Sequence, residues 1–196
     1  SVVVTACQSD PDIDITKLGV ETDPPDVLYK QALANMNKGN MTEASRKFEA
    51  IDKQYPFTEW GQKALVMQTF IATRTNKNDV AIASGSRFLR QYPRSKDAAY
   101  VQYMIGLAYS KQISDVTQDQ RAAQRTIEAM NKVVADYPDS EYVPDAQAKI
   151  RFARDQLAGR EMQVGRYYLE RKEYLAAVSR FRIVVEQYQN TNQIEE

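Results

Sequence analysis

The 196-residue chain is long enough for a single domain, and its 43% hydrophobic and 27% charged residues suit a folded protein with a core. The 26 basic and 26 acidic residues give a formal net charge of zero, so no overall field favours nucleic acid as a partner. The chain has no histidine and a single cysteine, which removes the commonest general base, the commonest metal ligand and any disulfide framework. We therefore predict no catalytic residue, no metal site and no cofactor.

The amino terminus opens with an apolar run that ends in small residues, which is typical of a secretory signal segment and its cleavage site. Val4-Thr5-Ala6-Cys7 resembles the lipobox of bacterial lipoproteins, in which the cysteine becomes the acylated first residue, and Gln8 suits sorting to the outer membrane. The alternative is a buried or chance cysteine, but the acidic, proline-containing stretch that follows is unfavourable for packing. We expect residues 1–6 to be a signal-peptide remnant, Cys7 to be the lipidation site, and residues 7–25 to form an acidic tether that is anchored to the membrane through this lipid.

One phrase returns four times after the tether. In each copy, small or apolar residues recur at steps of four, three and four, which places them on one face of a helix. The first three copies then end in Tyr-Pro, and proline disfavours continuation of the helix. The copies begin at Ala44, Ala81, Thr126 and Ala177, and they end at Tyr55-Pro56, Tyr92-Pro93, Tyr137-Pro138 and Tyr188.

The pattern of residues within these copies matches the tetratricopeptide repeat, a pair of antiparallel helices in about 34 residues. With Ala44 at position 20 of that pattern, Leu28 and Pro56 fall at positions 4 and 32. We therefore predict an all-α fold, a tetratricopeptide-like α-solenoid of helix-turn-helix repeats with an extended N-terminal tether. The repeat domain would cover residues 26–196, with repeats at 26–56, 58–93, 95–138 and 140–190.

Two departures from the regular repeat are predicted, together with three helix caps. Residues 111–120 lengthen the third repeat and form a loop. Residues 141–171 keep helical phase throughout, which predicts one helix of about 45 Å that projects beyond the stack and offers a surface to a partner. Thr58, Ser95 and Ser140 each follow a proline by two residues, and we expect them to cap the next helix.

The apolar side chains of the repeated phrase are expected to form the core, because stacked repeats bury such stripes between neighbours. This group includes Phe48, Ile51, Phe88, Phe181 and Val184. Residues of the first helices of repeats one and two would line the concave face, either as a groove for an extended or helical peptide or as ordinary packing between repeats. They are Tyr29, Leu33, Met36, Asn37, Val66, Phe70, Thr73 and Arg74.

Charge is not evenly spread along the chain. Between Lys149 and Arg182 nine basic residues face four acidic ones, a net charge of +5. Such a run is either a solvated face or a docking face for an acidic partner.

Four phrases in this order and spacing, together with the lipobox, resemble the BamD family, the outer-membrane lipoproteins of the β-barrel assembly (BAM) complex, over about residues 4–190. The phrases are Asp23-Pro24-Pro25-x2-Leu28-Tyr29, Gln54-Tyr55-Pro56-Phe57, Tyr100-x2-Tyr103-Met104-x-Gly106-Leu107 and Arg166-Tyr167-Tyr168-x-Glu170-Arg171.

This resemblance implies a scaffold without enzymatic activity, lipid-anchored at the periplasmic face of the outer membrane beside other BAM lipoproteins. It implies that the amino-terminal repeats recognise unfolded outer-membrane proteins and that the carboxy-terminal repeats dock on the POTRA domains of the barrel subunit BamA. An arginine that takes part in this docking in the family matches Arg180, and we expect Arg166, Arg171 and Lys172 to share the docking face. The family usually has a fifth repeat, and here Gln189 stands where the proline of the fourth copy would be.

The alternative function is that of a periplasmic tetratricopeptide adaptor for peptidoglycan or cell-division enzymes. The lipobox disfavours this alternative, because many such adaptors are soluble and carry coiled coils. Nucleic acid is not expected as a partner of an exported lipoprotein.

Overall fold

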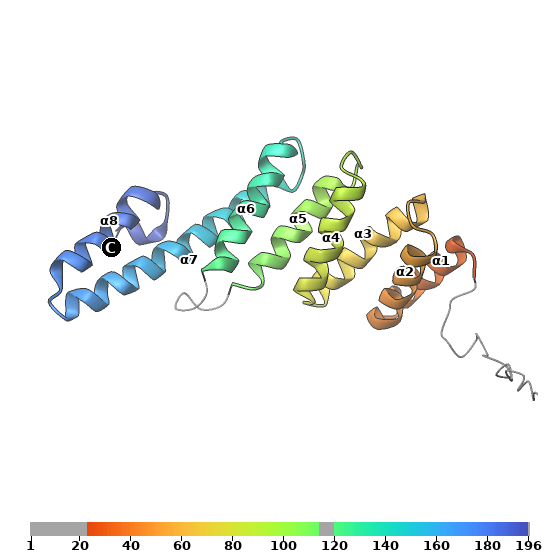
Figure 1. Cartoon of the computed structure of the whole chain (residues 1–196), viewed down its shortest axis with the longest axis horizontal. Coiled ribbons are helices and arrows are strands. Elements are labelled where there is room, and N and C mark those ends of the chain that lie inside the picture. Colours follow the sequence, from red (N-terminus) through yellow and green to blue (C-terminus); the bar gives the residue numbers. More distant parts are fainter. Residues whose placement is uncertain (1–22, 114–119, 196) are drawn as a thin grey trace, which may run out of the picture.

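The chain folds into helices joined by turns and loops, in a computed structural model that describes residues 23–113 and 120–195 (Figure 1). Within these ranges there are eight α-helices, a short 3-10 helix and no strand, so the prediction of an all-α fold is confirmed. The predicted signal remnant and the predicted lipidation site, Cys7, lie outside the described residues. The elements are α1 (Pro25–Asn37), α2 (Met41–Gln54), α3 (Glu59–Arg74), α4 (Asn78–Gln91), α5 (Ala98–Ser110), α6 (Arg121–Asp136), α7 (Val143–Glu170), α8 (Tyr174–Gln187) and η2 (Asn192–Glu195).

The helices pack in chain order, each against the next (Figure 1). The first helices of the hairpins, α1, α3, α5 and α7, also contact one another in succession. In the part of the chain that the structure describes, the second helices, α2, α4, α6 and α8, make no such close backbone contacts, although side chains of α2 and α4 reach each other. The result is an α-solenoid with an inner row of touching helices and an outer row of separated ones, as the repeated phrase predicts.

The second helix of each hairpin ends where the repeated phrase predicts. The helices α2, α4 and α6 stop one residue before the tyrosine of each Tyr-Pro pair. The backbone N–H of that tyrosine still donates to the carbonyl four residues back, at 2.8, 2.8 and 3.1 Å. The following proline has no N–H to continue this series, so the helix ends there.

Three of the hairpin turns share one backbone conformation. Gly39, Asn76 and Lys172 have φ angles of 78°, 57° and 62°, and each precedes the next helix by two residues. The residue after each of them donates its N–H to the carbonyl five residues back, at 2.9 Å in all three turns. This is the left-handed ending that commonly closes helices.

The helix caps agree with the prediction at one position of three. Thr58 caps α3 and accepts a hydrogen bond from the N–H of Gly61 at 3.1 Å. The predictions for Ser95 and Ser140 are wrong, because α5 and α7 begin three residues after these serines. Their hydroxyl oxygens accept instead from the N–H groups two residues on, at 3.2 and 3.3 Å, within the turns that precede the helices.

The core is divided into small clusters along the stack rather than gathered at one centre. Phe48, Ile51 and Phe88 are fully buried and Val184 is 2% exposed, as predicted. Phe181 is only partly buried, although its place in the repeat matches that of Met130, which is fully buried. The difference points to the last hairpin as the least covered part of the stack.

The helix α7 confirms the predicted long helix, with 28 residues and a length of about 42 Å at about 1.5 Å per residue. Ala146 in its first half packs in a cluster with Met130 and Val133 of α6. Met162 in its second half packs in a cluster with Val184 of α8. One helix therefore joins the third repeat to the last hairpin. The predicted loop at 111–120 lies between the end of α5 at Ser110 and the start of α6 at Arg121, and its residues 114–119 lie outside the described ranges.

Candidate docking face

The last hairpin is held together by a close contact between its two helices. Gly165 of α7 lies directly against the ring of Phe181 on α8, and a Cβ atom at position 165 would lie 2.4 Å from the nearest ring carbon. Only glycine permits this approach, which is the function that the Val164-Gly165-x2-Tyr168 phrase serves here.

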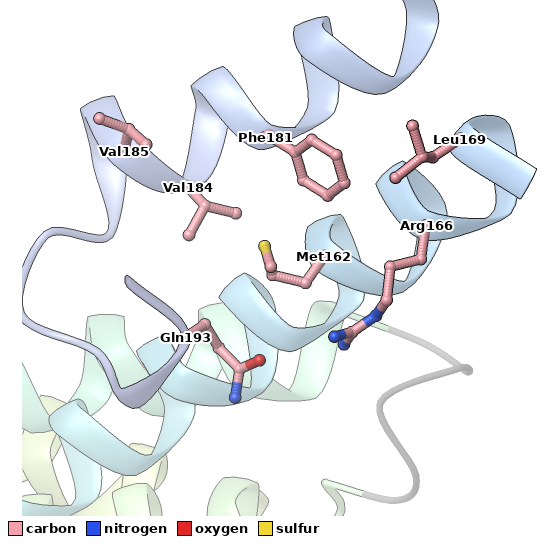
Figure 2. Close-up of a pocket in the computed structure, with 7 residues that line it drawn as sticks. All are labelled: Met162, Arg166, Leu169, Phe181, Val184, Val185 and Gln193. Carbon is pink, nitrogen blue, oxygen red and sulfur yellow. The ribbon is translucent and has the colours of Figure 1, made fainter. Parts of the chain in front are cut away.

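A cavity of about 420 Å³ opens between α7 and α8 (Figure 2). Its wall is mainly apolar, and Figure 2 shows Arg166 at its edge on α7, on the same helix as Met162 and Leu169. Phe181 and Val184 face it from α8. The remaining lining residues are Val185 and Gln193.

The outer surface of α8 carries large apolar side chains that are open to solvent. Leu175 is 90% exposed, Val178 is 52% exposed and Val185 is 57% exposed. Their spacing of three and seven residues places them on one side of the helix, with Arg182 between them. We call Leu175, Val178 and Val185 the terminal stripe.

The same positions in the earlier repeats are covered by the following helix. Val178 and Val185 stand ten and three residues before Tyr188, the closing tyrosine of the last copy. Ile82 and Leu89 of α4 stand ten and three residues before Tyr92, the closing tyrosine of the second copy. Both α4 residues are partly buried against clusters that include residues of α5. Among the described residues, only α7 and η2 contact α8, so the terminal stripe has no such cover. In the described chain it matches a surface that the next helix covers in the second repeat.

Arg180 lies beside an acidic residue of the neighbouring helix. Its Nη1 donates to Glu161 Oε2 on α7 at 3.1 Å. The Glu161 side chain is 15% exposed and that of Arg180 is 41% exposed, so the pair stands at the edge of the packed region. The ion pair fixes the arginine while leaving part of it accessible.

Arg171 and Lys172 form the turn at the end of the hairpin. Arg171 donates from Nε to Glu173 at 3.1 Å and from Nη1 to the Tyr167 hydroxyl at 3.2 Å. Its guanidinium also lies 5.4 Å from the centre of the Tyr167 ring. The hydrogen bond to Glu173, followed by the attraction to Tyr167, raises the pKa of Arg171 above its ordinary value, so the group stays charged. Lys172 is exposed and takes the left-handed turn conformation.

The four predicted docking residues therefore belong to one hairpin, at the second half of α7, its closing turn and α8. Sequence reasoning named the bases but missed their apolar neighbours, chiefly Leu169 and the terminal stripe. A signal was available: Val178 and Val185 occupy positions whose counterparts Ile82 and Leu89 are packing residues. Glu161, the partner of Arg180, had no such signal because it lies 19 residues away in the chain.

The predicted peptide groove lies at the other end of the stack, on α1 and α3. Tyr29 stacks edge-on against Phe48 at 5.3 Å between ring centres, and burial raises the pKa of its hydroxyl. Leu33, Met36 and Phe70 are partly buried against the same core cluster, while Val66 packs in the next cluster.

The remaining groove candidates divide into exposed and buried. Asn37 and Arg74 are exposed. Thr73 is 7% exposed, and its hydroxyl donates to the carbonyl of Thr69 at 2.8 Å, so it contributes to packing rather than to a surface. Trp60, which sequence reasoning missed, lies 5.5 Å from Tyr29 between ring centres and extends this aromatic surface onto α3.

The described residues offer neither a metal site nor a helix that could span a membrane. They contain no group of three or more cysteine and acidic side chains placed to hold a metal ion. None of their helices combines the length and the apolar character needed to cross a membrane.

Hairpins stacked in one direction, with a last helix left uncovered beside a run of bases, define a helical-repeat protein whose exposed end is suited to protein contacts. The chain belongs to the YfiO family of outer membrane lipoproteins, whose family model matches residues 21–196.

Similar proteins agree with this family. The chain is 37% identical to outer membrane protein assembly factor BamD of Caulobacter vibrioides, over 88% of this chain and 56% of that protein. It is 32% identical to the protein of the same name from Rickettsia prowazekii, over 86% of this chain and 67% of that protein. The chain thus spans between about half and two thirds of these relatives. Among solved structures, MamA 41-end from Desulfovibrio magneticus RS-1 gives a TM-score of 0.48 at 18% identity, over 87% of this chain and 79% of that one, which is too distant to add to the assignment.

Proposed function

We propose that this chain is a non-catalytic scaffold of outer-membrane β-barrel assembly, held at the periplasmic face of the outer membrane by a lipid on Cys7. Membership of a family of outer membrane lipoproteins supports the location. The names of the relatives, outer membrane protein assembly factor, support the role in assembly.

Within this role, the α7–α8 hairpin would dock on the POTRA domains of the barrel subunit BamA, in a complex with the other BAM lipoproteins. The observation that carries this proposal is the open terminal stripe, on a hairpin that also carries Arg166, Arg171, Lys172 and Arg180. A surface that combines exposed apolar side chains with bases able to pair with acidic groups has the composition of a protein interface, in which the apolar part supplies most of the affinity.

The opposite end of the stack would recognise unfolded outer-membrane proteins. Tyr29, Leu33, Met36, Val66 and Phe70 present partly exposed apolar surface on adjacent first helices. Such a surface suits extended, apolar segments of an unfolded chain.

A pull-down of the tagged, full-length chain from solubilised envelopes tests the docking. We expect the wild-type chain to recover the barrel subunit, and Arg180→Glu to reduce the recovery about tenfold because it places two carboxylates together at Glu161. Leu175→Glu changes the 90% exposed residue of the terminal stripe, cannot disturb the core, and should cause a similar loss. Arg94→Glu, an exposed reversal between α4 and α5, is the matched control.

Three outcomes would contradict the proposal. The first is recovery of the barrel subunit at wild-type level by both the Arg180 and the Leu175 variants. The second is an equal loss with Arg94→Glu, which would indicate a general charge effect. The third is recovery of peptidoglycan or cell-division enzymes in place of any barrel-assembly subunit, which would favour the adaptor function instead.

A further inference from the structure

A second surface with binding character lies in the outer row of helices, away from the docking hairpin. The helices α4 and α6 both pack on α5 and make no close backbone contact with each other (Figure 1). Side chains of all three helices line a groove between α4 and α6. A cavity of about 270 Å³ lies in this groove. Leu89, Ile105 and Tyr109 give its lining apolar surface beside the polar side chain of Gln102, and Arg90, Arg125 and Lys132 also line it.

The preceding pair of outer helices, α2 and α4, shows one way in which this position can be filled. Asp52 of α2 is 9% exposed and forms an ion pair with Arg87 of α4. Asp52 lies three residues before the closing tyrosine of its copy, and Arg87 lies five residues before the closing tyrosine of the next. A carboxylate and a base thus bridge these two outer helices.

The same two positions differ in the groove between α4 and α6. Lys132 stands five residues before Tyr137 and keeps the base, but Leu89 stands three residues before Tyr92 and replaces the acid. Both residues line the cavity. This groove therefore has a base at the position of Arg87 and an apolar residue at the position of Asp52.

The charges around the cavity are not balanced by the protein. Arg125 pairs with Glu128 on its own helix at 3.4 Å, and both side chains are 63% exposed. Arg90 and Lys132 are exposed and form no ion pair with any residue that the structure describes. Three bases and one acid leave a local charge of +2 beside this apolar surface.

We propose that this groove binds an acidic segment of a partner protein, with a carboxylate of the partner taking the place that Asp52 fills between α2 and α4. The carboxylate pairs with Lys132 and Arg90 from the two sides of the groove. A neighbouring apolar side chain of the segment lies on Leu89, Ile105 and Tyr109. Charge complementarity selects the segment, and burial of the apolar side chain holds it.

Fluorescence anisotropy on the full chain tests this proposal with two labelled peptides of about ten residues. In one, aspartate alternates with leucine; in the other, asparagine replaces every aspartate. We expect the aspartate peptide to bind about tenfold more tightly than the asparagine peptide, and the difference to shrink as salt is raised. The double variant Arg90→Glu/Lys132→Glu should lose about tenfold in affinity for the aspartate peptide.

Matched variants separate the groove from general charge. Lys38→Glu/Arg94→Glu changes two exposed bases elsewhere by the same net charge and should bind as the wild type does. Leu89→Asp places a carboxylate at the position that corresponds to Asp52 and should weaken peptide binding. Because Leu89 is partly buried, thermal unfolding of the Leu89→Asp variant is measured as well. If that variant does not fold, the double variant at the exposed Arg90 and Lys132 tests the proposal by itself.

Equal affinity for the two peptides would overturn the proposal, as would an equal loss in the Lys38/Arg94 control. Neutralising the acidic tether in the full chain, with Asp10→Asn, Asp12→Asn and Asp14→Asn, should leave peptide affinity unchanged. A marked gain in affinity in that variant would mean that the chain's own tether occupies the groove, and would overturn the assignment to a partner.

Discussion

One left-handed backbone conformation closes three helix hairpins, and three different residues adopt it. Gly39 adopts it at no steric cost, and a Cβ atom there would meet nothing within 4 Å. Asn76 is one of the few other residue types that tolerate it. Lysine does not tolerate this conformation well, so Lys172 carries about 1 kcal/mol of backbone strain in the turn beside the docking face.

Substitutions at Gly39, where the conformation has no steric cost, and at Lys172, where it is strained, should therefore change the free energy of unfolding in opposite directions. Gly39→Ala should lower the free energy of unfolding by about 1 kcal/mol, because alanine resists a positive φ whatever the space around it. Lys172→Gly should raise it by roughly 0.5 kcal/mol, since the relief of strain exceeds the added freedom of the unfolded chain. Urea unfolding measures both changes.

Lys172→Ala is the control, since it removes the charge but keeps a Cβ atom in the strained conformation. It should leave the urea midpoint near that of the wild type. A gain as large as that of Lys172→Gly would show that charge, and not backbone strain, limits stability at this turn.

The helix caps show where single residues predict structure and where they do not. Thr58, Ser95 and Ser140 are chemically similar and equally spaced from a proline, yet only Thr58 caps a helix. After Pro56 the chain reverses through Phe57, whose φ is 62°, and α3 begins three residues beyond the proline. The two serines follow no such reversal, and their helices begin five residues beyond the proline. A phenylalanine with positive φ is uncommon, so the sequence carried no warning of it.

At the scale of the element, α7 is the helix on which the rest of the carboxy-terminal half depends. Its first half completes the third repeat and its second half carries α8. Gly159 lies near the junction of the two halves. Breaking the helix there should separate two structures that are otherwise continuous.

Gly159→Pro should therefore detach the last hairpin without unfolding the stack. Proline in a helix interior removes a backbone hydrogen bond and costs about 3 kcal/mol or more. Hydrogen exchange followed by mass spectrometry should show faster exchange in residues 160–187, while α1 to α4 keep their protection because repeats contact only their neighbours. Gly159→Ala, with the strongest helix former at the same position, should keep the wild-type pattern, and uniform loss of protection in the proline variant would contradict this division.

The elements were predictable because their signals are local. Periodicity gave the paired helices and the long α7, and Tyr-Pro gave the ends of three second helices. The extent of burial was less predictable, because it depends on what covers a face. Phe181 fits the core stripe as well as Phe48 does, yet it remains partly exposed because only the short η2 follows α8 in the described chain, where a further α-helix follows α2. Thr73 fits a groove position, yet it is buried beside Thr69.

The candidate site was predictable only in its charged residues. Arg166, Arg171, Lys172 and Arg180 stand out in the sequence as a run of bases. The cavity beside Arg166 and the pairing of Arg180 with Glu161 depend on how two helices face each other. The positions of the cavity and of this ion pair depend on the close packing of α7 and α8 at Gly165, which the pattern of charged residues in the sequence does not predict.

For the whole molecule, the pattern of contacts predicts a gradient of local stability. The helix α5 packs against α3, α4, α6 and α7, whereas in the described chain α8 packs only against α7 and η2. Solenoid stability is close to a sum of repeat and neighbour contributions, so an element with fewer neighbours opens at lower cost.

We therefore expect amide hydrogens of α8 to exchange faster than those of α5 in the free protein. A docked partner that covers the terminal stripe should slow exchange in α8 and leave α5 unchanged. Exchange in α8 as slow as in α5 without any partner would mean that the hairpin is stable by itself and that the gradient does not exist.

The length of α7 has a mechanical consequence. A straight helix transmits rotation without absorbing it, and a tilt of about 5° at its contact with α6 would move its far end by about 4 Å, given a length of about 42 Å. That displacement approaches the spacing between neighbouring side chains on a helix, which is about 5–6 Å. Small adjustments in the third repeat would therefore be magnified at the hairpin, and α7 would act as a lever that sets the angle at which the terminal stripe is presented.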